Sequence, residues 1–164
     1  MPSTRFQRKS TIRRHEQEIT DRQAVEEILR KAVVCRIGLA DDNTPYIVPV
    51  CFGYEDGSIY LHSSPHGHKI DIIQRNKNVC FEVDVDVEMI PAPEACKWSV
   101  KYRSVIGFGK AAVIENEEEK IRALNIIMEH YSGRSDHEYS PHSLEKAAII
   151  RIQIQSMTGK SSKQ

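Results

Sequence analysis

The chain has 164 residues, enough for one domain that buries a substantial core. Its 23 lysine and arginine residues balance its 23 aspartate and glutamate residues, which argues against binding of nucleic acid by the molecule as a whole. No apolar run approaches the roughly 20 residues that a membrane-spanning helix needs, so no contact with a membrane is expected.

The N-terminal segment, residues 1–18, is basic and is predicted to be a partly flexible arm. Five cations precede its first acidic residue: Arg5, Arg8, Lys9, Arg13 and Arg14. A solvated arm is one interpretation, and contact with phosphate or nucleic acid is the other. A single folded domain is expected to span residues 19–160, followed by a polar tail at 161–164.

The first regular element is predicted to be a helix that ends near Lys31. A capping-box pattern begins at Thr20, and Val25, Ile28 and Leu29 follow at helical spacing. The buried stripe of this helix therefore faces the body of the protein.

Two strands are predicted next, over residues 32–40 and 46–54, with a turn at 41–43 between them. Pro49 lies in the middle of the second strand. Because proline cannot donate to a sheet ladder, it belongs at an edge, at a bulge or where pairing stops. A ligand lying against the strand and an ordinary edge position both explain it.

The stretch 58–73 reads S-I-Y-L-H-S-S-P-H-G-H-K-I-D-I-I and is the most informative part of the chain. A short strand gives way to a turn, and Ser64 before Pro65 predicts a helix cap and first helical position. Hydroxyls, free N–H groups and Lys69 at a helix start favour an anion such as phosphate. An ordinary strand-to-helix corner is the alternative.

The second half of the chain alternates between strands and helices. Residues 79–87 predict a half-buried strand, with its valines and Phe81 on one face and its acids on the other. A strand or pair of strands is expected at 98–114, and a last strand at 147–154.

A helix capped by Asn116 and ended by Gly133 is predicted to precede the last strand. Its buried stripe is expected at Ile121, Leu124, Ile127, Met128 and Tyr131. About six strands with few helices predict a mainly β (α+β) fold, an antiparallel barrel that is not fully sealed.

The four cysteines form no C-x-x-C pair. Three of them, Cys35, Cys51 and Cys80, lie in apolar β-type runs and are expected to be buried. Together with the lack of an apolar signal segment, this predicts a reduced, cytoplasmic protein without disulfides.

Six segments, in order, resemble the flavin-binding split-barrel proteins related to pyridoxamine 5′-phosphate oxidase, and most of all their nitroimidazole-resistance branch. They read R-R-H-E-Q-E-I-T-D, P-Y-I-V-P-V-C-F-G-Y, I-Y-L-H-S-S-P-H-G-H-K-I-D, N-V-C-F-E-V-D, K-Y-R-S-V-I-G-F-G-K-A and M-T-G-K. The resemblance implies a six-stranded antiparallel split β-barrel with flanking helices. It also implies a homodimer with one FMN in each of two clefts between the subunits.

The resemblance also implies which residues hold the cofactor. The FMN ring would lie along Ile47, Val48, Pro49, Val50 and Cys51. The phosphate would lie at the turn that carries His62, Ser63, Ser64, His68 and Lys69. The second subunit would contribute Tyr102 and Ser104. Relatives carry arginine where this chain has His68, which leaves Lys69 as the permanent cation and makes phosphate affinity sensitive to pH.

The leading functional hypothesis is an FMN-dependent oxidoreductase that reduces nitroaromatic or other small electrophilic compounds. The arginine and lysine that the oxidase itself carries on its second strand are absent here, which disfavours vitamin B6 as substrate. His62 is a candidate for the reactive face or, equally, a hydrogen-bond partner. A non-enzymatic flavin or haem protein is the alternative. Metal binding by His62, His66 and His68 is a weaker one, so no metal is predicted.

Overall fold

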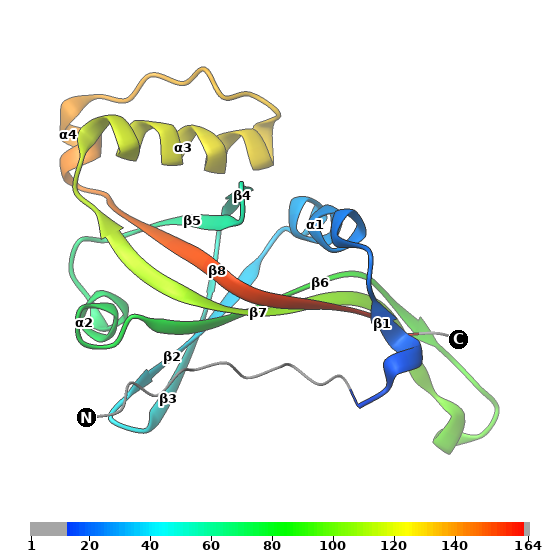
Figure 1. The fold of residues 1–164 in the computed structure, drawn as a ribbon. Coiled ribbons are helices and arrows are strands. Elements are labelled where there is room, and N and C mark those ends of the chain that lie inside the picture. The colour runs from blue at the N-terminus through cyan, green and yellow to red at the C-terminus, as the bar shows by residue number, and fades with distance from the viewer. Residues whose placement is uncertain (1–12, 163–164) are drawn as a thin grey trace.

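One antiparallel sheet of eight strands frames the protein in the computed structural model, which describes residues 13–162 (Figure 1). The strands are β1 (Glu18–Ile19), β2 (Cys35–Asp41), β3 (Thr44–Val50), β4 (Gly53–Glu55), β5 (Ser58–Ser63), β6 (Asn78–Ile90), β7 (Ser99–Ile114) and β8 (Ala148–Ser161). Their order is β3-β2-β6-β7-β8-β5-β4, and β1 pairs with β8.

Helices cover the ends and one side of this sheet (Figure 1). They are α1 (Arg22–Lys31), α2 (His68–Arg75), α3 (Glu117–Ser132) and α4 (Pro141–Glu145), with short 3-10 helices η1 (His15–Gln17) and η2 (Ala95–Lys97). The predicted mainly β architecture with flanking helices is confirmed. Part of the predicted basic arm, residues 1–12, lies outside the described residues.

The predicted number of six strands is wrong, for two physical reasons. The run expected as one strand at 46–54 is divided at Cys51 and Phe52 into β3 and β4. The two residues of β1 are too few to show a periodic pattern in the sequence. Because β3 and β4 are the two edges of the sheet and only two residues apart, the sheet curls until its edges approach without pairing. The barrel is therefore split.

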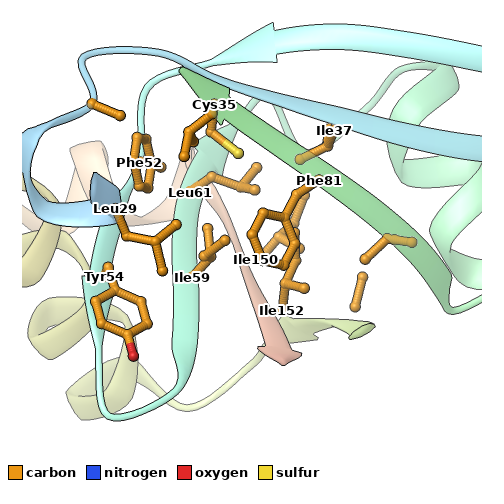
Figure 2. Packing of buried hydrophobic residues seen from close by; sticks show 14 of the residues in the cluster. Leu29, Cys35, Ile37, Phe52, Tyr54, Ile59, Leu61, Phe81, Ile150 and Ile152 are labelled. Carbon is orange, nitrogen blue, oxygen red and sulfur yellow. The ribbon is translucent and has the colours of Figure 1, made fainter. Parts of the chain in front are cut away.

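The core lies inside the curled sheet, where large side chains from β2, β5, β6 and β8 meet those of α1 and α2. Phe81, Ile37, Leu61 and Ile150 are almost fully buried there (Figure 2). Gly107 on β7 is required by this packing, because a Cβ at that position would collide with the ring of Phe81. β7 runs unbroken through Gly107, so the strand or pair of strands expected at 98–114 is a single strand.

Helix caps agree with the sequence in part. Asn116 caps α3 by accepting a hydrogen bond from the N–H of Glu119, at 3.0 Å, and Gly133 ends it in the left-handed region. For α1 the cap is Asp21 rather than Thr20, since Asp21 Oδ1 accepts from the N–H of Gln23 at 3.0 Å. Asp21 lies one residue nearer the helix than Thr20, so its carboxylate reaches this donor.

Three other expectations are corrected. The strand predicted at 147–154 continues to Ser161 as β8, because its polar side chains lie on an open face while the backbone pairs with β7. Val87 is exposed, because β6 has a bulge between Val85 and Glu88 that changes which face its residues occupy. In α3 the buried residues are Ala123, Ile126 and Ile127, whereas Tyr131 is exposed.

Candidate functional site

The turn between β5 and α2 ends at Gly67, directly before His68, the first helical residue of α2. Gly67 is the N-cap, with φ 134°, a conformation that residues with a Cβ rarely adopt. Ser64 was predicted to cap the helix, but its Oγ instead accepts a weak 3.4 Å bond from the N–H of His66 within the turn. The segment 64–67 thus forms a separate loop that leads into the helix.

Lys69 in the first turn of α2 is a half-buried cation. It forms no ion pair or hydrogen bond with any other residue in 13–162. Burial lowers the pKa of its ammonium group below the usual value, because no carboxylate offsets the lost hydration. An anion bound beside Lys69 would provide that missing compensation.

His68 brings the turn next to β3. Its ring meets the ring of Tyr46 edge-on, with centroids 5.0 Å apart. Tyr46 directly precedes the stretch 47–51, so the structure places the start of α2 beside the strand that was expected to lie along a flavin ring. Tyr46 was missed as a site residue because nothing in the sequence pairs it with a histidine 22 positions later.

β3 is an edge strand, one of the two explanations for Pro49, and within residues 13–162 it pairs only with β2. Ile47 and Pro49 point outward from the sheet, while Val48 and Val50 pack toward the core. Cys51, just beyond the strand, is exposed. A planar group against this edge would therefore touch the side chains of Ile47 and Pro49 and the backbone of the residues between them.

His62 and Ser63 close β5 and point to opposite sides of it, since neighbouring strand residues alternate. Ser63 lies across from Ala148 of β8 and is half-buried. His62 lies across from Ile149 and is exposed. Ser63 therefore shares a face with the buried Leu61, whereas His62 projects from the other face.

Tyr102 and Ser104 lie far along β7 from the α2 turn, so a single chain does not bring them to it. Ser104 is buried between Asp84 and Lys160 on the neighbouring strands. Lys160 Nζ donates to Tyr102 Oη at 3.1 Å and lies over its ring. Lys160 belongs to the M-T-G-K segment of the resemblance but was not predicted to be a site residue.

Neither a metal centre nor a membrane span is found in the part of the chain that the structure describes. Within residues 13–162 no three His, Cys, Asp or Glu side chains gather closely enough to hold a metal ion. His62, His66 and His68 therefore form no such group. No helix in that range is long and apolar enough to cross a membrane.

All four cysteines are free, and only Cys35 is buried as expected. Cys51 and Cys80 are exposed, which corrects the prediction for them. Cys80 alternates with the buried Val79 and Phe81, so an apolar run does not imply that every member faces the core. Burial raises the pKa of the Cys35 thiol to about 12.

We expect Cys51 and Cys96 to react with a thiol reagent in the folded protein, and Cys35 to react only when the protein unfolds. The reason is that the thiolate is the reactive form and Cys35 is both protonated and inaccessible. Thiol titration with and without urea measures this, and Cys96→Ala should remove one fast-reacting group. Reaction of Cys35 at the rate of Cys96 in the folded protein would contradict the prediction.

The sequence profile described as Pyridoxamine 5′-phosphate oxidase matches residues 21–161. A crystal structure of a candidate 5-nitroimidazole antibiotic resistance protein from Bacteroides thetaiotaomicron is 37% identical, with a TM-score of 0.79. The match covers 88% of this chain and 86% of that one. No protein with a curated description matches the sequence.

Two less similar structures share the fold. The flavocytochrome Anf3 from Azotobacter vinelandii is 20% identical with a TM-score of 0.80, and the match covers 94% of this chain and 73% of that one. The FAD and heme binding protein from Mycobacterium smegmatis is 19% identical with a TM-score of 0.81, covering 90% and 74%.

Proposed function

Because this chain belongs to the pyridoxamine 5′-phosphate oxidase family, we propose that it binds FMN and acts as an oxidoreductase on small electrophilic compounds, including nitroaromatic ones. The observation that carries the proposal is Lys69, a half-buried cation without a protein partner in residues 13–162, beside a turn rich in hydroxyls. A phosphate monoester matches that set of groups, because it offers negative charge and several acceptor oxygens.

The residues at the site divide the binding between the two ends of the cofactor. Lys69 would hold the phosphate, with Ser63 and Ser64 as hydrogen-bond donors and His68 as a neighbour. The outer edge of β3 would offer backbone groups and the apolar side chains of Ile47 and Pro49 to the ring. When bound, a flavin supplies the hydride and electron transfer, so that the chain's own task is to bind and orient.

The lack of a cation on the strand beside the site argues against one class of substrate, the vitamin B6 phosphates. The stretch 47–52 carries no cation, so that nothing on this strand would hold the phosphate of a vitamin B6 compound. The name of the similar protein from Bacteroides thetaiotaomicron supports a nitroimidazole-type substrate. His62, exposed and on the opposite face of β5 from Ser63, stays a candidate for contact with substrate.

A flavin or haem protein without catalytic turnover is the second candidate. It is supported by the names of the flavocytochrome and of the FAD and heme binding protein that share the fold. The absorption spectrum of purified protein, before and after addition of FMN or haem, distinguishes a flavin protein from a haem protein.

Turnover is tested by reducing the flavin-loaded protein with NAD(P)H and then adding a nitroaromatic compound. An oxidoreductase gives bleaching of the flavin absorbance followed by its recovery. A chromophore that responds to neither addition supports the binding protein. Protein that takes up no flavin at all contradicts the proposal.

The proposal includes a homodimer with a flavin cleft between subunits, and the sheet offers a surface for it. The side of β3, β2, β6 and β7 that is turned away from the core is the outer face of the sheet. Ile106 lies midway along β7 and is 48% exposed. Phe108 follows it on the same face, and Cys80 lies across from Phe108. Burial of such a patch against a second copy is the usual reason for its exposure.

We expect Ile106→Asp to convert the dimer largely to monomer, because two aspartates would be buried opposite each other across a two-fold axis. Sedimentation or light scattering at several concentrations measures the change. His142→Asp on the exposed side of α4 adds the same charge as a control and should leave the dimer intact. A dimer unaffected by Ile106→Asp would place the interface elsewhere.

A further inference from the structure

Arg36 on β2 lies beside the strand that is proposed to hold the flavin ring. In the register of β2 with β3, Arg36 is the direct partner of Pro49, and both residues are exposed. Directly opposed residues of an antiparallel pair project from the same face, with Cβ atoms about 4.5–5.5 Å apart. The side chain of Arg36 therefore leaves the outer face next to Pro49, within reach of a group bound beside the stretch 47–51.

Two carboxylates on β6 hold the guanidinium of Arg36 by one of its nitrogens. Nη1 donates to Glu82 Oε2 at 3.1 Å and to Asp84 Oδ1 at 2.6 Å. Nε and Nη2 donate to no atom of residues 13–162. These two nitrogens form one edge of the rigid, planar guanidinium and direct their N–H bonds in parallel. Arg36 therefore presents a pair of oriented donors that no acceptor in residues 13–162 uses.

Arg36 also lines a depression of about 330 Å³, a volume within the range of about 300–1,000 Å³ that small-molecule sites have. One wall is apolar and comes from the segment between α1 and β2, where Val33 is 68% and Val34 is 37% exposed. Tyr131 Oη donates to the Val33 carbonyl at 2.8 Å and accepts from the N–H of Phe52 at 3.0 Å. The apolar wall is thereby fixed beside the end of β3.

The charges that line the depression cancel. Its lining contains two cations and two carboxylates, paired as Arg36 with Asp84 and Lys31 with Asp86. An anionic ligand would be attracted by the cations but repelled by their carboxylate partners, and it would lose more hydration than a neutral ligand. The depression therefore favours a neutral ligand that has an apolar body and polarised oxygen atoms.

We infer that Arg36 binds the nitro group of the substrate through Nε and Nη2, with the body of the substrate against Val33 and Val34. The inference rests on the proposed function and names a substrate-binding residue of that same site. A nitro group holds two acceptor oxygens in one plane, as a carboxylate does, so that it matches the donor edge of a guanidinium without carrying a net charge. Glu82 and Asp84 act through Arg36 and are positioning residues.

Binding of matched ligands tests this contact without turnover. Flavin-loaded protein in the oxidised form, without a reductant, is titrated by calorimetry with 4-nitrobenzyl alcohol and with benzyl alcohol, which differ only in the nitro group. We expect the nitro compound to bind about tenfold more tightly, the gain expected from two hydrogen bonds. Arg36→Lys should remove most of this preference, because an ammonium group keeps the charge but not the two parallel donors.

Arg122→Lys is the matched control for this substitution. Arg122 on α3 is likewise held by a carboxylate, that of Glu55 on β4, and it does not line the depression. This variant should keep the full preference for the nitro compound. A third ligand, 4-(hydroxymethyl)benzoate, replaces the nitro group by a carboxylate and should bind more weakly than the nitro compound to the unmodified protein.

Turnover with two kinds of electron acceptor gives a second readout. Arg36→Lys should raise KM for 4-nitrobenzyl alcohol about tenfold and change KM for 1,4-benzoquinone much less. The two oxygens of the quinone lie at opposite ends of its ring, so that they cannot both reach one guanidinium edge. A general disturbance of the flavin or of the fold would affect both acceptors alike.

The outcomes separate this inference from the proposed function. Unmodified protein that takes up no flavin overturns both. Flavin-loaded protein that binds the two alcohols equally, or an Arg36→Lys variant that keeps the preference for the nitro compound, overturns the inference alone. Tighter binding of 4-(hydroxymethyl)benzoate than of the nitro compound likewise overturns it, because the depression would then favour an anion over a neutral group.

Discussion

Lys69→Ala is expected to weaken FMN binding about 10- to 100-fold and to leave riboflavin binding nearly unchanged, because a charge-assisted hydrogen bond to a charged group is worth about 1.5–3 kcal/mol. Only FMN has the phosphate that this bond would reach. Flavin fluorescence, which changes on binding, gives both dissociation constants in the same titration.

The matched control for this variant is Lys77→Ala. Lys77 lies just after α2 and is exposed, and its side chain forms no ion pair or hydrogen bond within residues 13–162. The Lys77→Ala substitution removes the same charge from the same region of the molecule, so nonspecific attraction of the phosphate would weaken equally in both variants. Equal losses for FMN and riboflavin in the Lys69 variant would show that Lys69 supports the fold of the turn rather than the phosphate.

The lowered pKa of Lys69 adds a test by pH. In the free protein the ammonium loses its proton below the usual lysine range, and a bound phosphate favours the protonated form. FMN affinity should therefore be greatest while Lys69 is protonated and fall as pH rises through its lowered pKa. Riboflavin affinity should not follow this decline, and the decline should vanish in Lys69→Ala.

The sequence predicted the elements of the site better than their boundaries. The turn at 63–69 was recognisable because hydroxyls, glycine and lysine gather there, and these residue types favour a turn and an anion whatever the rest of the fold is. The start of α2 was not, because Ser64 before Pro65 resembles a helix cap, while the backbone stays outside the helix until Gly67. A glycine three residues after Ser64 is compatible with either start, so that only the three-dimensional packing decides.

Contacts between distant segments were beyond reach of the sequence. Tyr46 meets His68 because β3 is an edge strand that passes the start of α2. The exposure of Met89 and Val87 depends on a bulge that breaks a perfect alternation of valines and acids. Such an irregularity costs one residue of register and leaves no compositional signal, yet it decides which face of the sheet Met89 occupies.

Phe52→Ala should lower the free energy of unfolding by about 3–5 kcal/mol, the usual cost of removing a fully buried phenylalanine. Phe52 occupies the corner where β3 passes into β4 (Figure 2), so its ring fills the place where the two edges of the split sheet approach. The ring packs on His130 with centroids 4.7 Å apart. The backbone N–H of Phe52 donates to Tyr131 Oη at 3.0 Å, and the substitution keeps this hydrogen bond.

Because that backbone bond survives in Phe52→Ala, the loss measures side-chain packing at the corner rather than the tie between β3 and α3. Urea unfolding at one fixed protein concentration gives the change, since dimerisation would otherwise shift the midpoint. Phe52→Leu, which refills most of the space, should cost about 1 kcal/mol, and the exposed Val33→Ala less than about 0.5 kcal/mol. If Phe52→Ala cost no more than Val33→Ala, the edges of the sheet would not be held together by this corner, and the position of β3 beside Lys69 would need another support.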